Sequence, residues 1–340
     1  MKVGQTMVVL GLAVLGLMVV HLWMGSILFS SQRLWAALCG APLQAGDDVI
    51  VWQFRMPKIG AALVSGASLS VSGLLMQTFF RNPIAGPFVL GISSGASLGV
   101  AVALLAAGWA SRWLGWIGVG TPDGLVLLLA IGGAALVLGL LLVVSWRIAD
   151  VNTLLILGLL FGSASGALVA LLQYFSSQQA LQQYMLWSMG SLTGVTRAQL
   201  GWLLPLCGGF FGGVWWWFKH LYALCLGPLF AFCLGVGVRQ LQRRIIVATA
   251  ILAGSSTAFC GPIAFVGIAV PHLARLLFRT HQHRILIAGT ALMGMLILLG
   301  CQLVAQLPGY ELVLPINVVT AFLGAPMVMY LVVSRRRIHT

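Results

Sequence analysis

The sequence predicts an all-α protein that crosses a membrane many times, and two observations support this class. Of its 340 residues, 60% are hydrophobic and only 7% are charged. Apolar runs of about 20 residues recur along the chain, and this is the length that a helix needs to cross a hydrocarbon core roughly 30 Å thick. Such a composition excludes a soluble core, so we expect a single transmembrane domain over residues 1–340.

Clusters of charged residues, prolines and glycines divide the chain into ten expected spans. The first run is long for a signal peptide and lacks a small-x-small cleavage site, so we expect it to be a retained span. The seventh and eighth spans are separated only by Cys260, Gly261 and Pro262. The ten ranges are approximately 6–24, 57–80, 87–108, 124–146, 152–174, 197–218, 244–260, 261–278, 285–305 and 314–333.

The basic residues predict the orientation of these spans. If the N-terminus is cytosolic, 13 of the 18 Lys and Arg residues lie on the cytosolic side and five on the outer side. Such a bias is typical of cytoplasmic loops, so we expect both termini in the cytosol. The net charge of +13 is explained in this way and does not indicate a nucleic-acid partner.

No nucleotide-binding loop is encoded. Such a loop needs Gly-Lys-Ser/Thr, whereas the three lysines, Lys2, Lys58 and Lys219, are followed by Val, Ile and His. None of the five acidic residues falls inside a long apolar run. The chain is therefore expected not to be an enzyme, and to be either a passive conduit or one part of a machine whose motor is another chain.

The cysteines and histidines do not indicate a metal site. The six cysteines include no C-x-x-C pair, so they are interpreted as small apolar packing residues. His272, His281 and His283 lie among arginines, which disfavour a bound cation. We expect no metal and no cofactor on this chain.

Three connections are too long to be simple turns. Residues 25–56 and 175–196 are expected outside, and residues 220–244 inside. The inner one is apolar but is broken by Gly227-Pro228 and Gly235. It predicts two short helices that meet at a sharp bend, either at the membrane surface or against another protein.

The two halves of the chain are similar in one feature. The segment RNPIAGPFVLGISSGASLG at 81–99 is echoed by GPIAFVGIAVPHLAR at 261–275. With ten spans, these segments have opposite orientations, which is typical of inverted repeats in transporters. We expect helices 2–5 and 7–10 to form the two repeats.

Five segments in a fixed order resemble the permease subunit of ABC importers for iron chelates, haem and vitamin B12, the FecCD-type family. They are FRMPKIGAALVSGASLSVSGLLMQTFFRNPIAGPFVLGISSGASLG (54–99), WSMGSL (187–192), LYALCLG with LGVGV (221–238), CGPIAFVGIAVPHLARLL (260–277) and LPINVVTAFLGAP (314–326). Together they cover nearly the whole chain after residue 50.

This resemblance implies a fold and a set of partners. It implies ten helices per subunit in the bacterial inner membrane, a second permease copy, and a periplasmic or lipoprotein substrate-binding protein. It also supplies the motor, a cytosolic ABC ATPase dimer that would bind ATP and Mg. The ligand would be an iron-siderophore, haem or cobalamin, and the permease itself would perform no bond chemistry.

The resemblance also implies roles for residues on the outer side. An arginine just before the second span receives an acidic residue of the binding protein in family members, and here that position is Arg55, with Lys58 beside it. An arginine at this place is expected to be exposed. At the outer end of the ninth span the usual Asp and Arg are replaced by Gln302 and Gln306, so we expect docking through Arg55, Lys58 and Gln306 with fewer ion pairs.

Two further sets of residues follow from the resemblance. The segment 220–243 would couple the permease to the ATPase through Ala223, Leu224, Leu226, Gly227, Leu234 and Gly235. In the fifth span, glycines at a spacing of four share a helix face, and such stripes most often let helices pack closely. The resemblance favours the alternative that the fifth and tenth spans line the pathway, through Gly158, Gly162, Ser165, Gly166, Thr320 and Gly324.

Two alternatives stay open at this point. An ion-coupled secondary transporter needs no separate ATPase, but it normally places acidic residues or histidines at membrane depth, where this chain has only His21 near a span end. A passive channel or a membrane scaffold is the other alternative. Co-purification with an ATPase and ATP-dependent uptake would separate all three.

Overall fold

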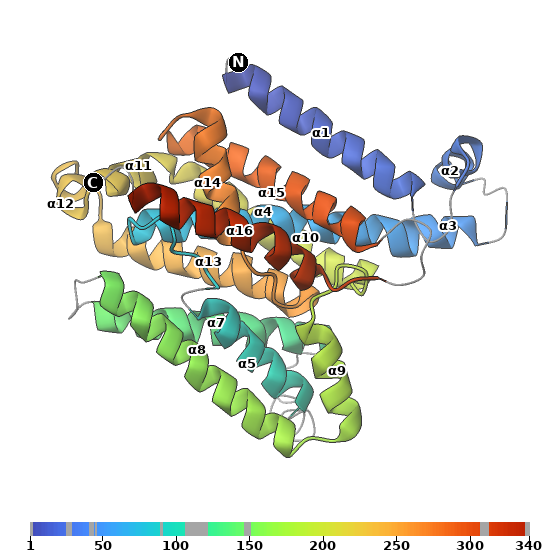
Figure 1. The fold of residues 1–340 in the computed structure, drawn as a ribbon, viewed down its shortest axis with the longest axis horizontal. Coiled ribbons are helices and arrows are strands. Elements are labelled where there is room, and N and C mark those ends of the chain that lie inside the picture. Colours follow the sequence, from blue (N-terminus) through green and yellow to red (C-terminus); the bar gives the residue numbers. More distant parts are fainter. Residues whose placement is uncertain are drawn as a thin grey trace.

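The computed structural model describes residues 3–24, 29–40, 44, 46–88, 91–105, 122–145, 151–306 and 313–336 (Figure 1). Within these residues the chain forms helices, turns and bends but no strand, which confirms the all-α class. The helices are α1 (Val3–Trp23), α2 (Ser31–Leu38), α3 (Asp47–Val49), the π-helix η1 (Ile50–Arg55), α4 (Met56–Phe79), α5 (Ile92–Leu105), α7 (Pro122–Ser145), α8 (Val151–Tyr174), α9 (Gln178–Ser188), α10 (Arg197–Trp216), α11 (Phe218–Leu226), α12 (Pro228–Cys233), α13 (Val238–Cys260), α14 (Val266–Phe278), α15 (His283–Ala305) and α16 (Ile316–Arg336).

Six helices in the described residues are long and apolar enough to cross a membrane. Three shorter apolar helices accompany them, and α10, which is rich in glycine and tryptophan, belongs to neither group. The count of ten spans therefore stays a prediction. The six are Val3–Trp23, Asp47–Phe79, Gly124–Val144, Ile156–Tyr174, Val238–Cys260 and His283–Ala305, and the three are Ile92–Leu105, Val266–Phe278 and Ile316–Tyr330.

Two helices begin later than the expected spans. The expected range 87–108 starts before α5, because residues 81–88 form turns and Gly91 has a φ of 74°. The expected range 261–278 starts before α14, because Gly261 and Phe265 have φ values of 73° and 66°. Positive φ values lie outside the right-handed helical region, so neither segment continues a helix.

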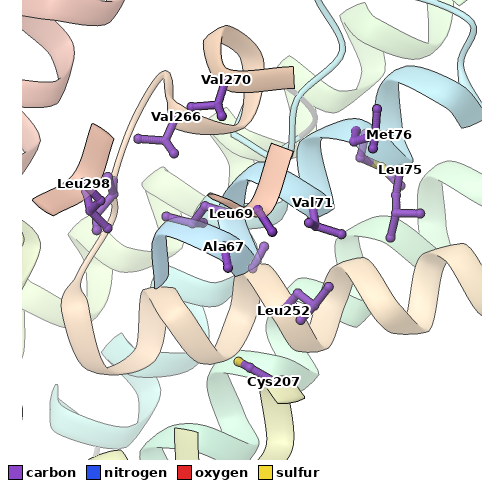
Figure 2. Close-up of a cluster of buried hydrophobic side chains, with 14 of the residues drawn as sticks. Ala67, Leu69, Val71, Leu75, Met76, Cys207, Leu252, Val266, Val270 and Leu298 are labelled. Carbon is purple, nitrogen blue, oxygen red and sulfur yellow. The ribbon is translucent and has the colours of Figure 1, made fainter. Parts of the chain in front are cut away.

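Helix α4 is the centre of the molecule. It packs against α15, α13, α14, α10 and α11, and most of its side chains are buried. Figure 2 shows Ala67, Leu69 and Val71 of α4 among side chains of the neighbouring helices. These neighbours come from four helices, through Cys207, Leu252, Val266, Val270 and Leu298. A shift of α4 would therefore disturb packing with several helices at once.

Glycines let α4 approach two of these helices closely. A Cβ atom on Gly66 would lie 2.5 Å from the carbonyl oxygen of Gly294 in α15. A Cβ atom on Gly73 would likewise collide with the carbonyl of Gly267 in α14. Small residues at helix contacts are the usual way in which membrane helices approach each other.

A second group of helices lies on the other side of α13, in the lower half of Figure 1. Helix α5 packs against α7, α8 and α9, while α13 packs against both α7 and α5. Helix α8 covers this group and keeps much of its surface exposed. Helices α12 and α2 with α3 lie at opposite ends of the molecule (Figure 1).

Candidate functional site

The connection between α10 and α13 contains two short helices joined at Gly227. Helix α11 ends at Leu226, and Gly227 adopts φ 136° and ψ 148°. This conformation is essentially restricted to glycine. Pro228 then occupies the first turn of α12, where its fixed φ and missing N–H fit a helix start. The sequence Gly-Pro thus produces a sharp bend between the two helices.

Helix α12 presents an apolar surface. Leu229 is 78% exposed and Phe232 is 70% exposed, whereas Ala231 is buried. A hollow of about 1010 Å³ lies beside these side chains, lined by Pro228, Leu229, Phe232, Gly235, Val236, Gly237, Val238, Arg239 and Gln240. Exposed apolar patches of this kind commonly mark sites of interaction.

The residues expected to couple to a partner divide into two sets. Ala223 and Leu224 are buried, and Leu224 packs in the hydrophobic core, so neither side chain is exposed in this subunit and their coupling role stays a prediction. Leu226, Leu234 and Gly235 are exposed, and Gly227 is buried at the bend. The sequence indicates apolar coupling contacts at Pro228 and Leu229 after the bend, but the expected residues did not include Phe232. The spacing of three between Leu229 and Phe232 indicates one helix face.

The border of this surface is positively charged. Arg239 and Arg243 in the first turns of α13 are exposed, and the Arg244 guanidinium lies 5.7 Å from the ring centre of Trp217. The sequence contains no acidic residue between Asp150 and Glu311. The surface around α12 thus combines an apolar helix with a cationic border.

At the end of the molecule opposite α12, an ion pair joins α2 to α3 (Figure 1). The guanidinium of Arg33 donates from Nε and Nη2 to the two carboxylate oxygens of Asp47, at 2.7 and 2.5 Å. The hydrogen bond to this carboxylate raises the pKa of Arg33. Phe29 packs against both Arg33 and Arg55, whose guanidinium carbons lie 4.6 and 4.3 Å from its ring centre.

Arg55 is not exposed, contrary to expectation. Only 7% of its surface is accessible, and its Nη1 donates a hydrogen bond to the backbone oxygen of Leu22 at the end of α1. Stacking on Phe29 covers another part of the guanidinium. Arg55 thus links α1 to the start of α4, and its role in docking stays a prediction.

The structure brings together the other two residues expected at the docking face. The ammonium of Lys58 donates a hydrogen bond to the side-chain oxygen of Gln306. Gln302, one turn earlier in α15, is buried, and its Nε2 has no hydrogen-bond partner among the described residues. Within the part of the chain that the structure describes, no ion pair is formed at this place, where Gln302 and Gln306 stand.

The three glycines of α8, Gly158, Gly162 and Gly166, have different surroundings. Gly158 is buried, and a Cβ atom on the neighbouring Gly91 would lie 2.7 Å from its carbonyl oxygen. A Cβ atom on Gly162 would lie 3.3 Å from the hydroxyl of Ser94 in α5. Ser165 is also buried, whereas Gly166 has no neighbouring atom near its Cβ position. Of this set, Gly166 alone lies on an open face of the described subunit.

The two residues expected on the tenth span also pack inside the subunit. Thr320 is buried and donates to the backbone oxygen of Asn317 at 3.2 Å. A Cβ atom on Gly324 would lie 2.9 Å from Cγ of Phe265. The exposed face of α16 is formed instead by Val318, Phe322 and Leu323.

The described residues contain no cluster of three or more potential metal ligands. His281 is exposed, whereas His283 is buried and forms a hydrogen bond of 2.9 Å with Thr78. The described cysteines form no disulfide.

Comparisons with known proteins show the family and the fold of the chain. The FecCD transport family matches residues 12–334. The vitamin B12 import system permease protein BtuC of Klebsiella pneumoniae is 36% identical over 298 residues, which cover 87% of this chain and 86% of that protein. BtuC of Salmonella typhimurium is 36% identical over 296 residues, covering 87% of each protein.

Solved structures show the same fold. An ABC transporter assigned to the metal-chelate type, in an inward-facing conformation, superposes with a TM-score of 0.82 at 26% identity, covering 98% of this chain and 99% of that chain. PsaBC from Streptococcus pneumoniae, in complex with a Fab, has a TM-score of 0.57 at 14% identity, covering 83% of this chain and 91% of that chain, which is a likeness of fold alone. The chain belongs to the FecCD transport family, as a multi-pass inner-membrane permease subunit of an ABC importer and not an enzyme.

Proposed function

We propose that this permease works in an ATP-driven importer that moves an iron-siderophore, haem or cobalamin into the cytoplasm. The observation that carries the proposal is the exposed apolar helix α12, joined through the bend at Gly227 to a helix whose other side is buried in the core. Such a surface is suited to bind a partner and to transmit its movement. The partner is a cytosolic ABC ATPase dimer, which binds the ATP and Mg.

A second copy of the permease completes the pathway. Helices α8 and α16 keep long apolar faces exposed in the single subunit. These faces extend over several turns, which supports packing against a second copy with the pathway between the two. On α8 they are formed by Ile156, Leu159, Leu160, Leu168 and Leu171, and on α16 by Val318, Phe322 and Leu323.

The orientation follows from the position of the bend. In Figure 1 the C-terminal end of α16 lies at the same end of the molecule as α12, and α2 and α3 lie at the opposite end. An ATPase on α12 therefore implies a cytosolic C-terminus, in agreement with the distribution of basic residues. The substrate-binding protein would then dock at the end formed by α2, α3 and the start of α4.

Uptake by the reconstituted complex tests this function. The permease, its ATPase and its binding protein are placed in proteoliposomes with ATP on the ATPase side. Radiolabelled cyanocobalamin, a ferric hydroxamate siderophore and haem are supplied in parallel, with cyanocobalamin first because the BtuC relatives are named for vitamin B12 import. We expect accumulation of one ligand that requires ATP and stops when ADP replaces it.

Uptake without the ATPase would contradict the proposal. Accumulation driven by a proton or sodium gradient in vesicles that contain the permease alone would indicate a secondary carrier. If the permease binds the ATPase but the complex accumulates none of the three ligands, the proposed substrate class is excluded. The proposed arrangement of subunits would still stand.

A further inference from the structure

The inner end of α4 carries a buried polar contact to α15. The hydroxyl of Thr78 lies 2.8 Å from the backbone oxygen of Leu74 and 2.9 Å from Nε2 of His283. Both side chains are buried. A hydroxyl has only one proton, so both contacts form hydrogen bonds when Thr78 donates to Leu74 and His283 donates from Nε2 to Thr78.

The same histidine contacts the first helix of the bend. The ring centre of Tyr222 in α11 lies 6.3 Å from that of His283, with an angle of 68° between the ring planes. This edge-to-face geometry is a favoured arrangement of aromatic rings. Helix α11 packs against both α15 and α4, and the neighbouring Leu221 is fully buried. His283 thus lies where α4, α11 and α15 meet.

A second polar contact fixes the same end of α4 to α14. Gln77 donates from Nε2 to the backbone oxygen of Ile268 at 3.1 Å and accepts from Nη2 of Arg275 at 2.5 Å. Of these two adjacent contacts, the one through His283 also reaches α11. It adds a polar connection between the bend and the central helix to the direct packing of α11 on α4.

We propose that His283 is a positioning residue that transmits the movement of α11 and α12 to α4 during transport. Contacts between apolar side chains are not directional, whereas a buried hydrogen bond fixes one geometry and is costly to leave unmade. Thr78 and His283 should therefore move together when an ATPase displaces the bend. This inference rests on the proposed function, because it requires a partner at α12.

Two substitutions that remove the hydrogen bond test the inference. Thr78→Val keeps nearly the same shape, and His283→Leu keeps an apolar group in the cavity. Uptake and ATP hydrolysis are measured in the proteoliposomes described above. The ligand is the one of cyanocobalamin, siderophore and haem that the unaltered complex accumulates. Each variant should lower the uptake per ATP hydrolysed by about tenfold, which corresponds to the loss of one hydrogen bond of ordinary strength.

The matched variants separate coupling from general damage. Thr78→Ser and His283→Gln keep a hydroxyl and an N–H donor, so they should restore most of the uptake per ATP. The double variant Thr78→Val with His283→Leu should be no worse than the worse single variant, since both remove the same bond. His281→Leu serves as a control because His281 is exposed two positions away.

Each outcome either supports or overturns the inference. If Thr78→Val assembles normally and couples uptake to ATP like the unaltered protein, His283 does not transmit the movement, even if His283→Leu fails to fold. If Phe232→Glu in α12 uncouples the complex while Thr78→Val does not, the inference fails and the proposed function stands. If neither α12 nor this contact affects ATP-driven uptake, the inference fails and α12 is not the coupling surface. The proposed function itself fails only if the unaltered complex shows no ATP-dependent uptake.

Discussion

The ammonium of Lys58 in the first turn of α4 is hydrogen-bonded to the side chain of Gln306 directly after α15. This bond joins the outer ends of two helices that also touch through Gly66 and Gly294. A cation expected to face a binding protein is therefore held within the subunit. With Arg55 buried as well, the outer face presents less accessible positive charge than the sequence indicates.

Two substitutions of Gln306 should change the affinity for the binding protein in opposite directions. Gln306→Glu should hold Lys58 more firmly as an ion pair, and should weaken binding of an acidic binding protein by about threefold to tenfold. Gln306→Leu removes the acceptor and should tighten binding by a similar factor. Binding is measured on the complex at low and at physiological salt, and equal affinities for both variants would exclude Lys58 from the docking surface.

Replacement of Arg55 should destabilise the protein in addition to any effect on docking. Arg55→Ala leaves the backbone oxygen of Leu22 without its donor and removes the stacking on Phe29, at a cost of about 2 kcal/mol. Thermal unfolding in detergent measures this loss. Arg197→Ala is the control, because Arg197 is exposed at the start of α10 and its removal should change stability by less than about 0.5 kcal/mol. An Arg55→Ala variant as stable as the control would contradict the linking role.

The fold was largely predictable because charged residues, prolines and glycines, which commonly end membrane helices, can be recognised in the sequence. The expected range 285–305 and α15 differ by two residues, since His283 and Arg284 lie at the border of an apolar run. The late start of α14 was not predictable in this way. Gly261 marks the break after α13, but the start of α14 at Val266 also depends on Phe265, whose φ of 66° is unusual for a bulky residue.

The candidate site was predictable in place but not in side-chain direction. The bend at Gly227 followed from Gly-Pro, yet the burial of Leu224 and the exposure of Leu229 depend on how α11 packs against α4 and α15. The burial of Arg55 depends on Leu22, 33 positions earlier in the chain. Contacts at such separations leave no local pattern in the sequence.

Gly227→Val should uncouple ATP hydrolysis from uptake. Valine at a φ of 136° costs about 1–3 kcal/mol, and the chain would relieve this strain by reorienting α12 relative to α11. ATP hydrolysis should persist while uptake per ATP falls. The matched control is Gly209→Val, at an exposed position in α10 with no atom near its Cβ position. Equal coupling in the two variants would show that the bend angle is unimportant.

The glycines of α8 should respond differently to leucine. Gly162→Leu pushes into Ser94 and should lower the stability of the subunit by about 1–3 kcal/mol. Gly166→Leu meets no neighbouring atom, so the subunit should stay stable while uptake falls, if this face borders the second copy or the pathway. Gly132→Leu on the exposed side of α7 is the control. Normal uptake by Gly166→Leu would place this face against lipid.

Phe232→Glu should separate the permease from its ATPase. Phe232 is among the most exposed large apolar side chains of α12, and burying a phenylalanine in an interface contributes about 2 kcal/mol. A carboxylate at this position would lose that contribution and would have to be desolvated. The amount of co-purified ATPase should therefore fall by at least about tenfold.

The control Phe175→Glu makes the same change on an exposed phenylalanine between α8 and α9, within the connection expected on the outer side. If Phe232→Glu retains the ATPase as well as Phe175→Glu does, α12 is not the attachment surface, and the cationic border at Arg239 and Arg243 becomes the next region to test.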